Sequence, residues 1–271
     1  LFILLLAPEF YAPLRQLGSD YHARAEAVGA MQVLTPLLDA NTWQPQGAPL
    51  FPVVDSAEPL ALACCELSVS GEGGRLRLAP LNLTLAAGER LLVQGESGVG
   101  KSSLLQALLG FTAYQGNLKA NGRELSQWSR IAWQGQLGYL SQQPPIQSGS
   151  VGENLRLAGP DKTDEELVEV LTLVGLWPIL QRGNGLATQL GERGQGLSGG
   201  QLQRLGLAQL LLRDAALWLF DEPTAHLDPD AAWQLNTLIG KLSRGRSVII
   251  VSHESAGLEW VDRAIELTSR E

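Results

Sequence analysis

Hydrophobic and polar positions divide the chain into three stretches. In residues 9–39 apolar side chains recur at roughly helical intervals, which predicts an amphipathic helix. Residues 40–59 are rich in proline and lack a clear period, so we expect a linker there. From residue 60 to residue 271, short apolar runs alternate with amphipathic segments and glycine turns. This alternation predicts a domain in which strands and helices follow one another.

The strands and helices of the third stretch can be placed individually. Two neighbouring segments, Leu60–Val69 and Leu76–Leu85, predict a pair of strands. Buried strands are expected at Glu89–Gln94, Leu137–Leu140, Ala216–Phe220 and Ser247–Val251, and helices at Lys101–Leu109, Thr163–Val174, Gly200–Leu212, Pro229–Leu242 and Ser255–Val261. Strands that alternate with helices imply an α/β fold with a mainly parallel sheet covered on both faces.

Composition narrows the class of protein. Of 271 residues 45% are hydrophobic and 18% are charged, as in ordinary globular proteins, which excludes a disordered chain. The net charge of −8 argues against nucleic acid as a partner, so any phosphate site must be local. Cys64 and Cys65 lie in a predicted strand, and we interpret both as core residues in a reducing compartment.

The first eight residues, LFILLLAP, form an apolar run. The run is much shorter than the roughly 20 residues of a membrane span, and it lacks the basic start of a secretory signal. Because the helical pattern of residues 9–39 continues from it, we interpret residues 1–39 as the cytoplasmic end of a membrane helix. The alternative is the buried start of an ordinary helix.

A glycine-rich segment follows the strand predicted at Glu89–Gln94. From Gly95 to Ser102 it fits the pattern GxxxxGK[ST], in which backbone N–H groups surround phosphate oxygens. The helix that follows adds partial positive charge at its first turn. Lys101 would reach the β- and γ-phosphates, and the Ser102 hydroxyl would bind Mg²⁺. We therefore expect ATP to contact Gly95, Glu96, Ser97, Gly98, Val99, Gly100, Lys101, Ser102 and Ser103.

Two carboxylates end the strand predicted at Ala216–Phe220. Beside a phosphate loop, Asp221 would lie near Mg²⁺. Glu222, one residue on, would point to the other side of the strand and could polarise an attacking water as general base. A strand that ends in two carboxylates is common at protein surfaces, and its combination with the phosphate loop predicts nucleotide hydrolysis.

A second candidate anion site precedes the helix predicted at Gly200–Leu212. Ser198 is expected to cap this helix, and the glycines leave backbone N–H groups free to meet an anion. The chain already has one complete phosphate loop. The second helix start therefore suggests the γ-phosphate of an ATP held mainly by another subunit. The residues concerned are Leu197, Ser198, Gly199, Gly200 and Gln201.

Together these motifs resemble the nucleotide-binding domain of ABC ATPases, over residues 60–271. The segment Leu197 to Gln201 matches the family's LSGGQ signature, and Asp228 lies in a match to its D-loop. The resemblance implies a P-loop NTPase fold with a mainly parallel sheet, an antiparallel β subdomain and an α-helical subdomain. It further implies ATP and Mg²⁺ as ligands, with catalytic residues Glu222, His253 and Gln142 and metal-binding residues Ser102, Gln142 and Asp221.

The chain departs from the family at the adenine. ABC ATPases usually place an aromatic residue upstream of the phosphate loop to stack on the base. Residues 52–110 contain no Phe, Tyr or Trp, and Gly71 lies near the expected position. We expect weakened ATP affinity or base selectivity unless Arg75, Arg77 or a partner residue covers the base.

Other stretches resemble ABC exporters in particular. Residues 188–194 resemble the exporter X-loop, and residues 147–155 resemble the exporter segment after the Q-loop. Residues 1–39 are similar to the end of the last membrane helix in a bacterial branch that exports glutathione and cysteine for cytochrome bd assembly. This implies one half-transporter with its own membrane domain and a second half-transporter as partner, forming a heterodimer, at the bacterial inner membrane with this domain on the cytoplasmic side. The alternatives are a homodimeric lipid or drug exporter, and a soluble ABC ATPase of DNA repair or translation.

Overall fold

The computed structural model describes residues 11, 16–17, 20–21, 23–32, 35 and 58–268. Contacts divide the chain into two units, Leu1–Thr42 and Trp43–Glu271. Most of the predicted linker, residues 40–57, lies outside the described residues, as does the apolar run of residues 1–8. The two units are therefore considered separately.

The first unit is helical at every described position. This agrees with the helix predicted over residues 9–39. The described apolar side chains on it are exposed within this chain, among them Tyr11, Leu17, Tyr21, Val28 and Met31. None of the helices in the described part of the chain has both the length and the apolar character needed to cross a bilayer.

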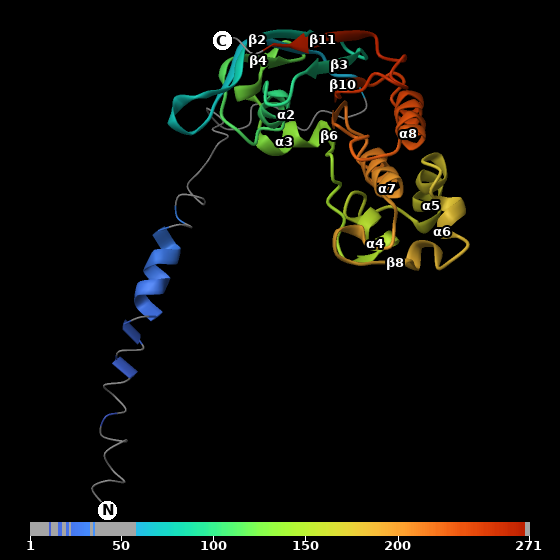
Figure 1. The fold of residues 1–271 in the computed structure, drawn as a ribbon, viewed down its shortest axis with the longest axis horizontal. Helices are drawn as coiled ribbons and strands as arrows, with labels where there is room; N and C mark the ends of the chain where they lie inside the picture. The colour runs from blue at the N-terminus through green and yellow to red at the C-terminus, as the bar shows by residue number, and fades with distance from the viewer. Residues whose placement is uncertain are drawn as a thin grey trace, which may run out of the picture. The chain divides into compact units, whose positions relative to one another are not determined.

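The second unit contains an antiparallel sheet with strand order β2-β1-β4-β5 (Figure 1). The predicted strand pair forms two of its members, with Leu62 opposite Leu85 and Ser70 opposite Leu76. The two strands from the carboxyl side of the phosphate loop were absent from the sequence prediction. The bounds are β1 Leu62–Ser70, β2 Leu76–Leu85, β4 Gln115–Ala120 and β5 Arg123–Glu124.

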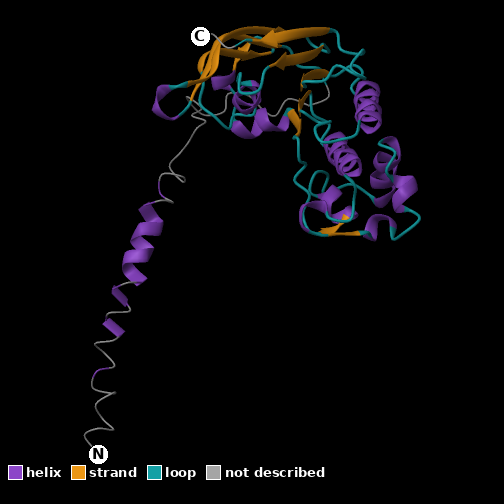
Figure 2. Cartoon of the chain, in the orientation of Figure 1, coloured by secondary structure: helices purple, strands orange, loops and turns teal. Residues whose placement is uncertain are grey.

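A five-stranded sheet with order β11-β3-β10-β9-β6 forms the centre of the unit, and all its pairs are parallel. All four predicted buried strands belong to it, and β11 is the additional edge strand. Figure 2 shows the strands of the two large sheets gathered together, with helices packed against them. The bounds are β3 Arg90–Gly95, β6 Leu137–Leu140, β9 Leu217–Asp221, β10 Ser247–Val251 and β11 Arg263–Leu267.

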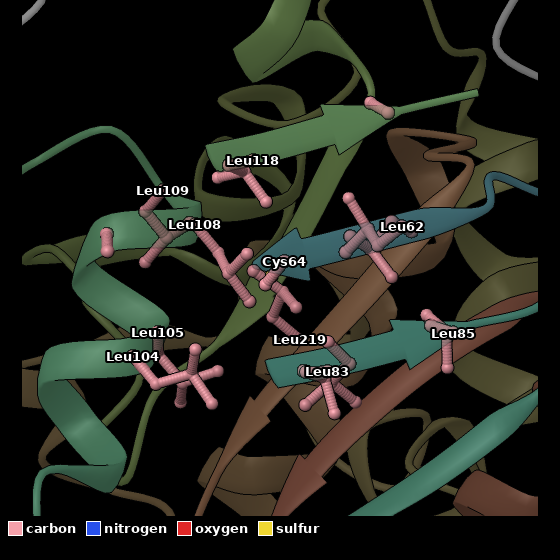
Figure 3. Packing of buried hydrophobic residues seen from close by; sticks show 14 of the residues in the cluster. Leu62, Cys64, Leu83, Leu85, Leu104, Leu105, Leu108, Leu109, Leu118 and Leu219 are labelled. Carbon is pink, nitrogen blue, oxygen red and sulfur yellow. The ribbon is translucent and has the colours of Figure 1, made fainter. Parts of the chain in front are cut away.

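The parallel sheet separates two hydrophobic clusters because neighbouring strand residues point to opposite faces. In β9, Leu217 and Leu219 join the cluster that contains the antiparallel sheet and α2, whereas Trp218 and Phe220 join the cluster formed with the other helices. Both faces of the sheet are thus covered, as predicted. Figure 3 shows the first cluster, with side chains from β1, β2 and α2 converging on Leu219, among them Leu62, Cys64, Leu83, Leu85, Leu104 and Leu108.

Helices cover this framework. Four predicted helices are present within a residue or two of the expected bounds. The helices α4, α5 and α8 each contact α7. Their bounds are α2 Lys101–Leu108, α3 Arg130–Gly135, α4 Val151–Arg156, α5 Asp164–Leu173, α6 Trp177–Leu180, α7 Gly199–Leu212 and α8 Pro229–Leu242. Short 3-10 turns occupy Glu72–Gly74, Leu125–Gln127, Gly185–Ala187 and Glu192–Gly194, and a two-stranded ribbon joins β7 Gly149–Ser150 to β8 Gln189–Leu190.

Two predictions were wrong in part. The segment Ser255–Val261 forms turns and not a helix, because Gly257 adopts φ +74°. The segment is instead hydrogen-bonded to α8. The Asn236 side chain donates to the Ala256 carbonyl, and the Trp260 side chain donates to the Asn236 carbonyl. The second error concerns the cysteines. Cys64 is buried, and burial raises the pKa of its thiol to about 12, whereas Cys65 is exposed because it points to the opposite face of β1.

Candidate functional site

The phosphate loop joins β3 to α2. Gly95, Gly98 and Gly100 all have positive φ, at 148°, 86° and 107°, a region that other residues rarely adopt. At Gly100 a Cβ atom would collide with the carbonyl oxygen of Arg77, so the loop packs directly on β2. Glycine is thus required both by the backbone conformation and by the close approach. The strand, loop and helix have the arrangement that the motif predicts.

Lys101 is the first residue of α2 and is only 6% exposed. Its Nζ atom donates to the carbonyl oxygens of Gly95 at 2.7 Å and Glu96 at 2.9 Å. The same atom lies 3.0 Å from Nε2 of His253. A buried ammonium requires such partners, and these partners hold it above the loop, where phosphate oxygens would be attracted to it.

A cavity of about 480 Å³ opens beside this lysine. The phosphate loop and the start of α2 form one wall, and the segment from Gly71 to Arg77 forms another. Glu222 and His253 also contribute to the lining. Gly95, Glu96 and Val99 are not among the residues that line the cavity. The predicted loop residues that line it are Ser97, Gly98, Gly100, Lys101, Ser102 and Ser103.

Asp221 ends β9 and faces the hydroxyl of Tyr139, whose oxygen lies 3.3 Å from Oδ2. Burial raises the pKa of Asp221, and Glu222 acts in the same direction, while the Tyr139 hydrogen bond and Lys101 oppose the shift. Burial and the neighbouring carboxylate also raise the pKa of Tyr139 to about 12. The sequence analysis missed Tyr139, whose only signal was its place in a strand next to β9.

Glu222 departs from simple strand alternation. Continuation of β9 would direct it to the face that holds Phe220, but its backbone has φ +47°, in the left-handed region. Its side chain consequently reaches the cavity, where Oε1 lies 3.0 Å from Nε2 of His253. Backbone strain of this kind is concentrated at functional sites. The structure therefore brings Glu222, the predicted base, and His253, the other predicted catalytic residue of this cavity, together.

The donor set around the loop fits a magnesium ion. Ser102 lines the cavity and offers a hydroxyl. Asp221 is not among the lining residues, but it offers a carboxylate at the end of β9, separated from β3 by β10, and it interacts electrostatically with Lys101. Mg²⁺ prefers oxygen ligands and is usually held by one or two protein groups together with substrate phosphates. These two residues supply what such a site requires.

Gln142 lies elsewhere in this structure. It lines a second cavity of about 430 Å³, together with Arg193, Gly199 and Leu227 among others. It is not among the residues that line the phosphate-loop cavity. Its carbonyl oxygen accepts a hydrogen bond from Nε2 of Gln203, on α7, at 2.7 Å. The structure thus places the predicted Mg²⁺ ligand Gln142 beside the signature helix and not beside Ser102.

The close approach of this segment to α7 depends on a glycine. A Cβ atom at Gly206 would lie 2.9 Å from both Cβ and Cγ of Pro144 and 2.6 Å from Cδ1 of Leu140. Any larger side chain would force the helix away from the glutamine-containing segment. Packing at Gly206 and the hydrogen bond from Gln203 therefore join α7 to residues 142–144 at two neighbouring positions.

The signature segment caps α7 as predicted. The Ser198 hydroxyl accepts from the Gln201 N–H at 3.4 Å, and the Ser198 N–H donates to Oε1 of Gln201 at 2.9 Å. This reciprocal capping box leaves the N–H groups of the two glycines free of helix partners. Asp228 has a similar role on α8, where its Oδ1 accepts from the Ala231 N–H at 2.9 Å. Across residues 58–268, the lining of the phosphate-loop cavity includes no residue of the segment from Leu197 to Gln201.

Comparison with known proteins agrees with this geometry. The family profile described as ABC transporter matches residues 78–225. The chain is 37% identical over 263 residues to the glutathione/L-cysteine transport system ATP-binding/permease protein CydD of Escherichia coli, covering 95% of this chain and 44% of that protein. It is 34% identical to the transport ATP-binding protein AarD of Providencia stuartii, over 92% of this chain and 42% of that protein. It is 30% identical to the corresponding CydC of Bacillus subtilis, over 95% of this chain and 44% of that protein.

A solved structure shares the fold. The structure of a bacterial Atm1-family ABC exporter with ATP bound superposes with a TM-score of 0.78 at 23% identity, over 96% of this chain and 46% of that chain. The chain thus spans less than half the length of the relatives that it matches. The predicted combination of a parallel sheet, an antiparallel sheet and a helical part is confirmed by this likeness. The chain belongs to the ABC transporter family.

Proposed function

We propose that the cavity beside Lys101 binds ATP with Mg²⁺ and that Glu222 activates the water that attacks the γ-phosphate. Lys101 would neutralise phosphate charge, while Ser102 and Asp221 would hold the metal, which offsets charge on the β- and γ-phosphates. Glu222 and His253 line the same cavity, 3.0 Å apart, so that both can face the γ-phosphate. Glu222 takes the water's proton, and His253 hydrogen-bonds the phosphate. We keep Gln142 as a candidate ligand that would have to move toward Ser102.

We further propose that two such domains complete each other's sites head to tail. The carrying observation is the separation of the two phosphate-binding elements: within residues 58–268, the signature segment lies off the cavity that holds Lys101, Glu222 and His253. The capped start of α7, with Ser198 exposed and glycines at its first positions, would then meet the γ-phosphate of a nucleotide bound by the partner. Asp228, in the loop before α8, would lie at the same dimer interface.

The dependence of hydrolysis on concentration tests this shared site. Specific activity of the chain is expected to rise with protein concentration or with added partner domain, because only a dimer is complete. Ser198→Arg should abolish the rise while ATP still binds to the variant. Mixing Ser198→Arg with Lys101→Ala should restore some activity, because one of the two sites in the mixed dimer keeps both intact elements. A specific activity that is independent of concentration in a verified monomer would contradict the proposal.

The transported molecule we propose is a small thiol, glutathione or cysteine. Support comes from the curated relatives, since proteins described as glutathione/L-cysteine transport components align with 95% of the chain at 37% and 30% identity. Both CydD and CydC proteins are among them. We therefore propose a heterodimer of two half-transporters in the bacterial inner membrane, each with its own membrane domain, with this domain on the cytoplasmic side and thiol export serving cytochrome bd assembly.

Transport into inside-out vesicles tests the substrate. The full-length half-transporter, produced with its partner, should accumulate labelled glutathione or cysteine inside the vesicles when ATP is added. Vesicles that carry Lys101→Ala should show no ATP-dependent uptake. If the wild-type protein instead moves a lipid or a drug and leaves both thiols outside, the alternative exporter function would replace this one.

A further inference from the structure

The wall of the cavity formed by the segment from Gly71 to Arg77 adjoins the phosphate loop and contains the side chain of Arg77. A Cβ atom at Gly71 would lie 2.7 Å from Nε of Arg77 and 3.2 and 3.3 Å from its Cγ and Cδ. The arginine side chain therefore occupies the space that any side chain at position 71 would fill. Gly71 has ordinary extended backbone, with φ −97° and ψ −171°, so the limit at this position is space and not conformation.

The position of Arg77 relative to the phosphate loop is fixed by the backbone. Its carbonyl oxygen packs against Gly100, and the Cα atom of the next residue, Leu78, lies 3.0 Å from where a Cβ of Gly100 would be. Gly100 caps α2, on which Lys101 is the first residue. The backbone of Arg77 is consequently held next to the start of α2, where Lys101 would bind the phosphates.

Arg77 is exposed at the cavity, and its guanidinium has no ion pair or hydrogen bond with the side chains described in residues 58–268. The cavity lining contains no aromatic residue over that same range, and apart from the phosphate loop, Glu222 and His253 it consists of Gly71, Arg75, Leu76 and Arg77. A nucleotide whose phosphates bind at Lys101 must place its base at some other wall of this cavity. The wall that carries Arg77 presents a planar cation there, which none of the side chains described in residues 58–268 pairs with.

We propose that the guanidinium of Arg77 is the platform on which the nucleotide base stacks, with Gly71 providing the space for the arginine side chain. This inference rests on the proposed ATP site. Guanidinium groups are flat and weakly hydrated and stack on aromatic faces, where the π-electrons attract the positive charge. The base therefore gains a cation–π contact in the place where an aromatic side chain would offer ring stacking. Arg77 is a residue for base binding and takes no part in the chemistry at the γ-phosphate.

The test separates contact with the base from attraction of the phosphates. Dissociation constants for Mg-ATP and for Mg²⁺ with inorganic triphosphate, which has no base, are measured by calorimetry on the full 271-residue chain. Arg77→Ala is expected to weaken ATP binding about tenfold, which corresponds to about 1.4 kcal/mol, and to leave triphosphate binding unchanged. Arg77→Lys keeps the charge and loses the plane, so it should behave as the alanine variant does.

Arg182→Ala is the control, because Arg182 is an exposed arginine that carries the same charge and does not line this cavity. It should leave the ratio of the two dissociation constants as in the wild type. Equal weakening of ATP and triphosphate by Arg77→Ala, or unchanged ATP binding in that variant, would overturn the base platform while leaving the ATP site intact. A wild-type chain that binds neither ligand would instead overturn the ATP site itself.

Discussion

Nε2 of His253 lies 3.0 Å from Oε1 of Glu222 and 3.0 Å from Nζ of Lys101. A single ring nitrogen can accept from the ammonium or donate to the carboxylate, but it cannot do both at once. The three side chains thus form one connected group around the cavity, in which a change at one residue alters the hydrogen bonding of the others. Bound phosphate would compete for the lysine and release the histidine from it.

Glu222→Gln is expected to lower the rate of ATP hydrolysis by roughly 10²- to 10⁴-fold, the usual loss for a general base. The amide keeps the size of the side chain but cannot take the water's proton. Removal of one negative charge beside the γ-phosphate should preserve or strengthen ATP binding. Single-turnover hydrolysis measures the rate, and calorimetric titration measures the affinity for ATP. Both are measured on this domain paired with its partner domain.

Glu254→Gln serves as the control, because that exposed carboxylate follows His253 directly but does not line the cavity. Its hydrolysis rate should equal that of the wild type. Wild-type hydrolysis by the Glu222 variant would remove Glu222 from the role of base and leave the phosphate loop untouched.

Lys101→Ala should remove most ATP binding. The substitution deletes the fixed cation of the loop and leaves the carbonyl oxygens of Gly95 and Glu96 without their present donor. Titration with Mg-ATP checks the affinity, and circular dichroism checks that the fold persists. Lys119→Ala removes a lysine that forms a surface ion pair with Glu124 and should bind ATP normally. Equal affinity in the two variants would contradict the assignment of Lys101.

Gly100→Ala is expected to destabilise the chain more than Gly98→Ala. Both glycines belong to the phosphate loop and have positive φ, so both variants share a backbone strain of about 1–2 kcal/mol. A Cβ at Gly100 also collides with the Arg77 carbonyl, whereas a Cβ at Gly98 meets no atom within 4 Å. Urea unfolding measures the difference. Similar free energies of unfolding for the two variants would show that the loop can move away from β2 at little cost.

Asp221→Asn should stabilise the nucleotide-free chain at neutral pH. Since burial raises the folded-state pKa of Asp221, folding disfavours its ionised form. The resulting cost to stability is present in full above the folded-state pKa and disappears as the pH falls below the ordinary value of about 3.9. Thermal unfolding at about pH 7.5 and at about pH 4.5 should therefore show a difference in melting temperature between variant and wild type that narrows in acid.

The control for this pH dependence is Asp161→Asn, which removes an exposed carboxylate. It should show little effect on stability at either pH. A difference in melting temperature between Asp221→Asn and the wild type that widens as the pH falls would contradict this prediction, because it would mean that folding favours the ionised carboxylate.

Much of this fold can be predicted from local sequence pattern. The strands that form the centre of the sheet, such as Ser247–Val251, are continuous apolar runs, and both faces of each are buried. By contrast, β4 has the sequence QGNLKA, of which only Leu118 and Ala120 are buried, and its place in the sheet depends on its pairing with β1. Such long-range pairing leaves no local period in the sequence.

In the candidate site, too, the features set by local sequence can be predicted, whereas those set by long-range contacts cannot. The loop from Gly95 to Ser102 is a contiguous motif, so its geometry follows from its own residues. The direction of Glu222 depends on a positive φ that strand alternation does not reveal, and the location of Gln142 depends on contacts with α7. The sequence does not reveal that Gly71 leaves space for the side chain of Arg77, because this contact depends on how β2 is placed in the fold.

The joint between α7 and residues 142–144 has a mechanical consequence. A hydrogen bond and a packed glycine hold the two segments at neighbouring points, which leaves them no freedom to slide or rotate past one another without breaking both contacts. The two segments are therefore expected to move together as one rigid body. A displacement of the segment near Gln142 is expected to move Ser198, which caps the amino-terminal end of the same helix.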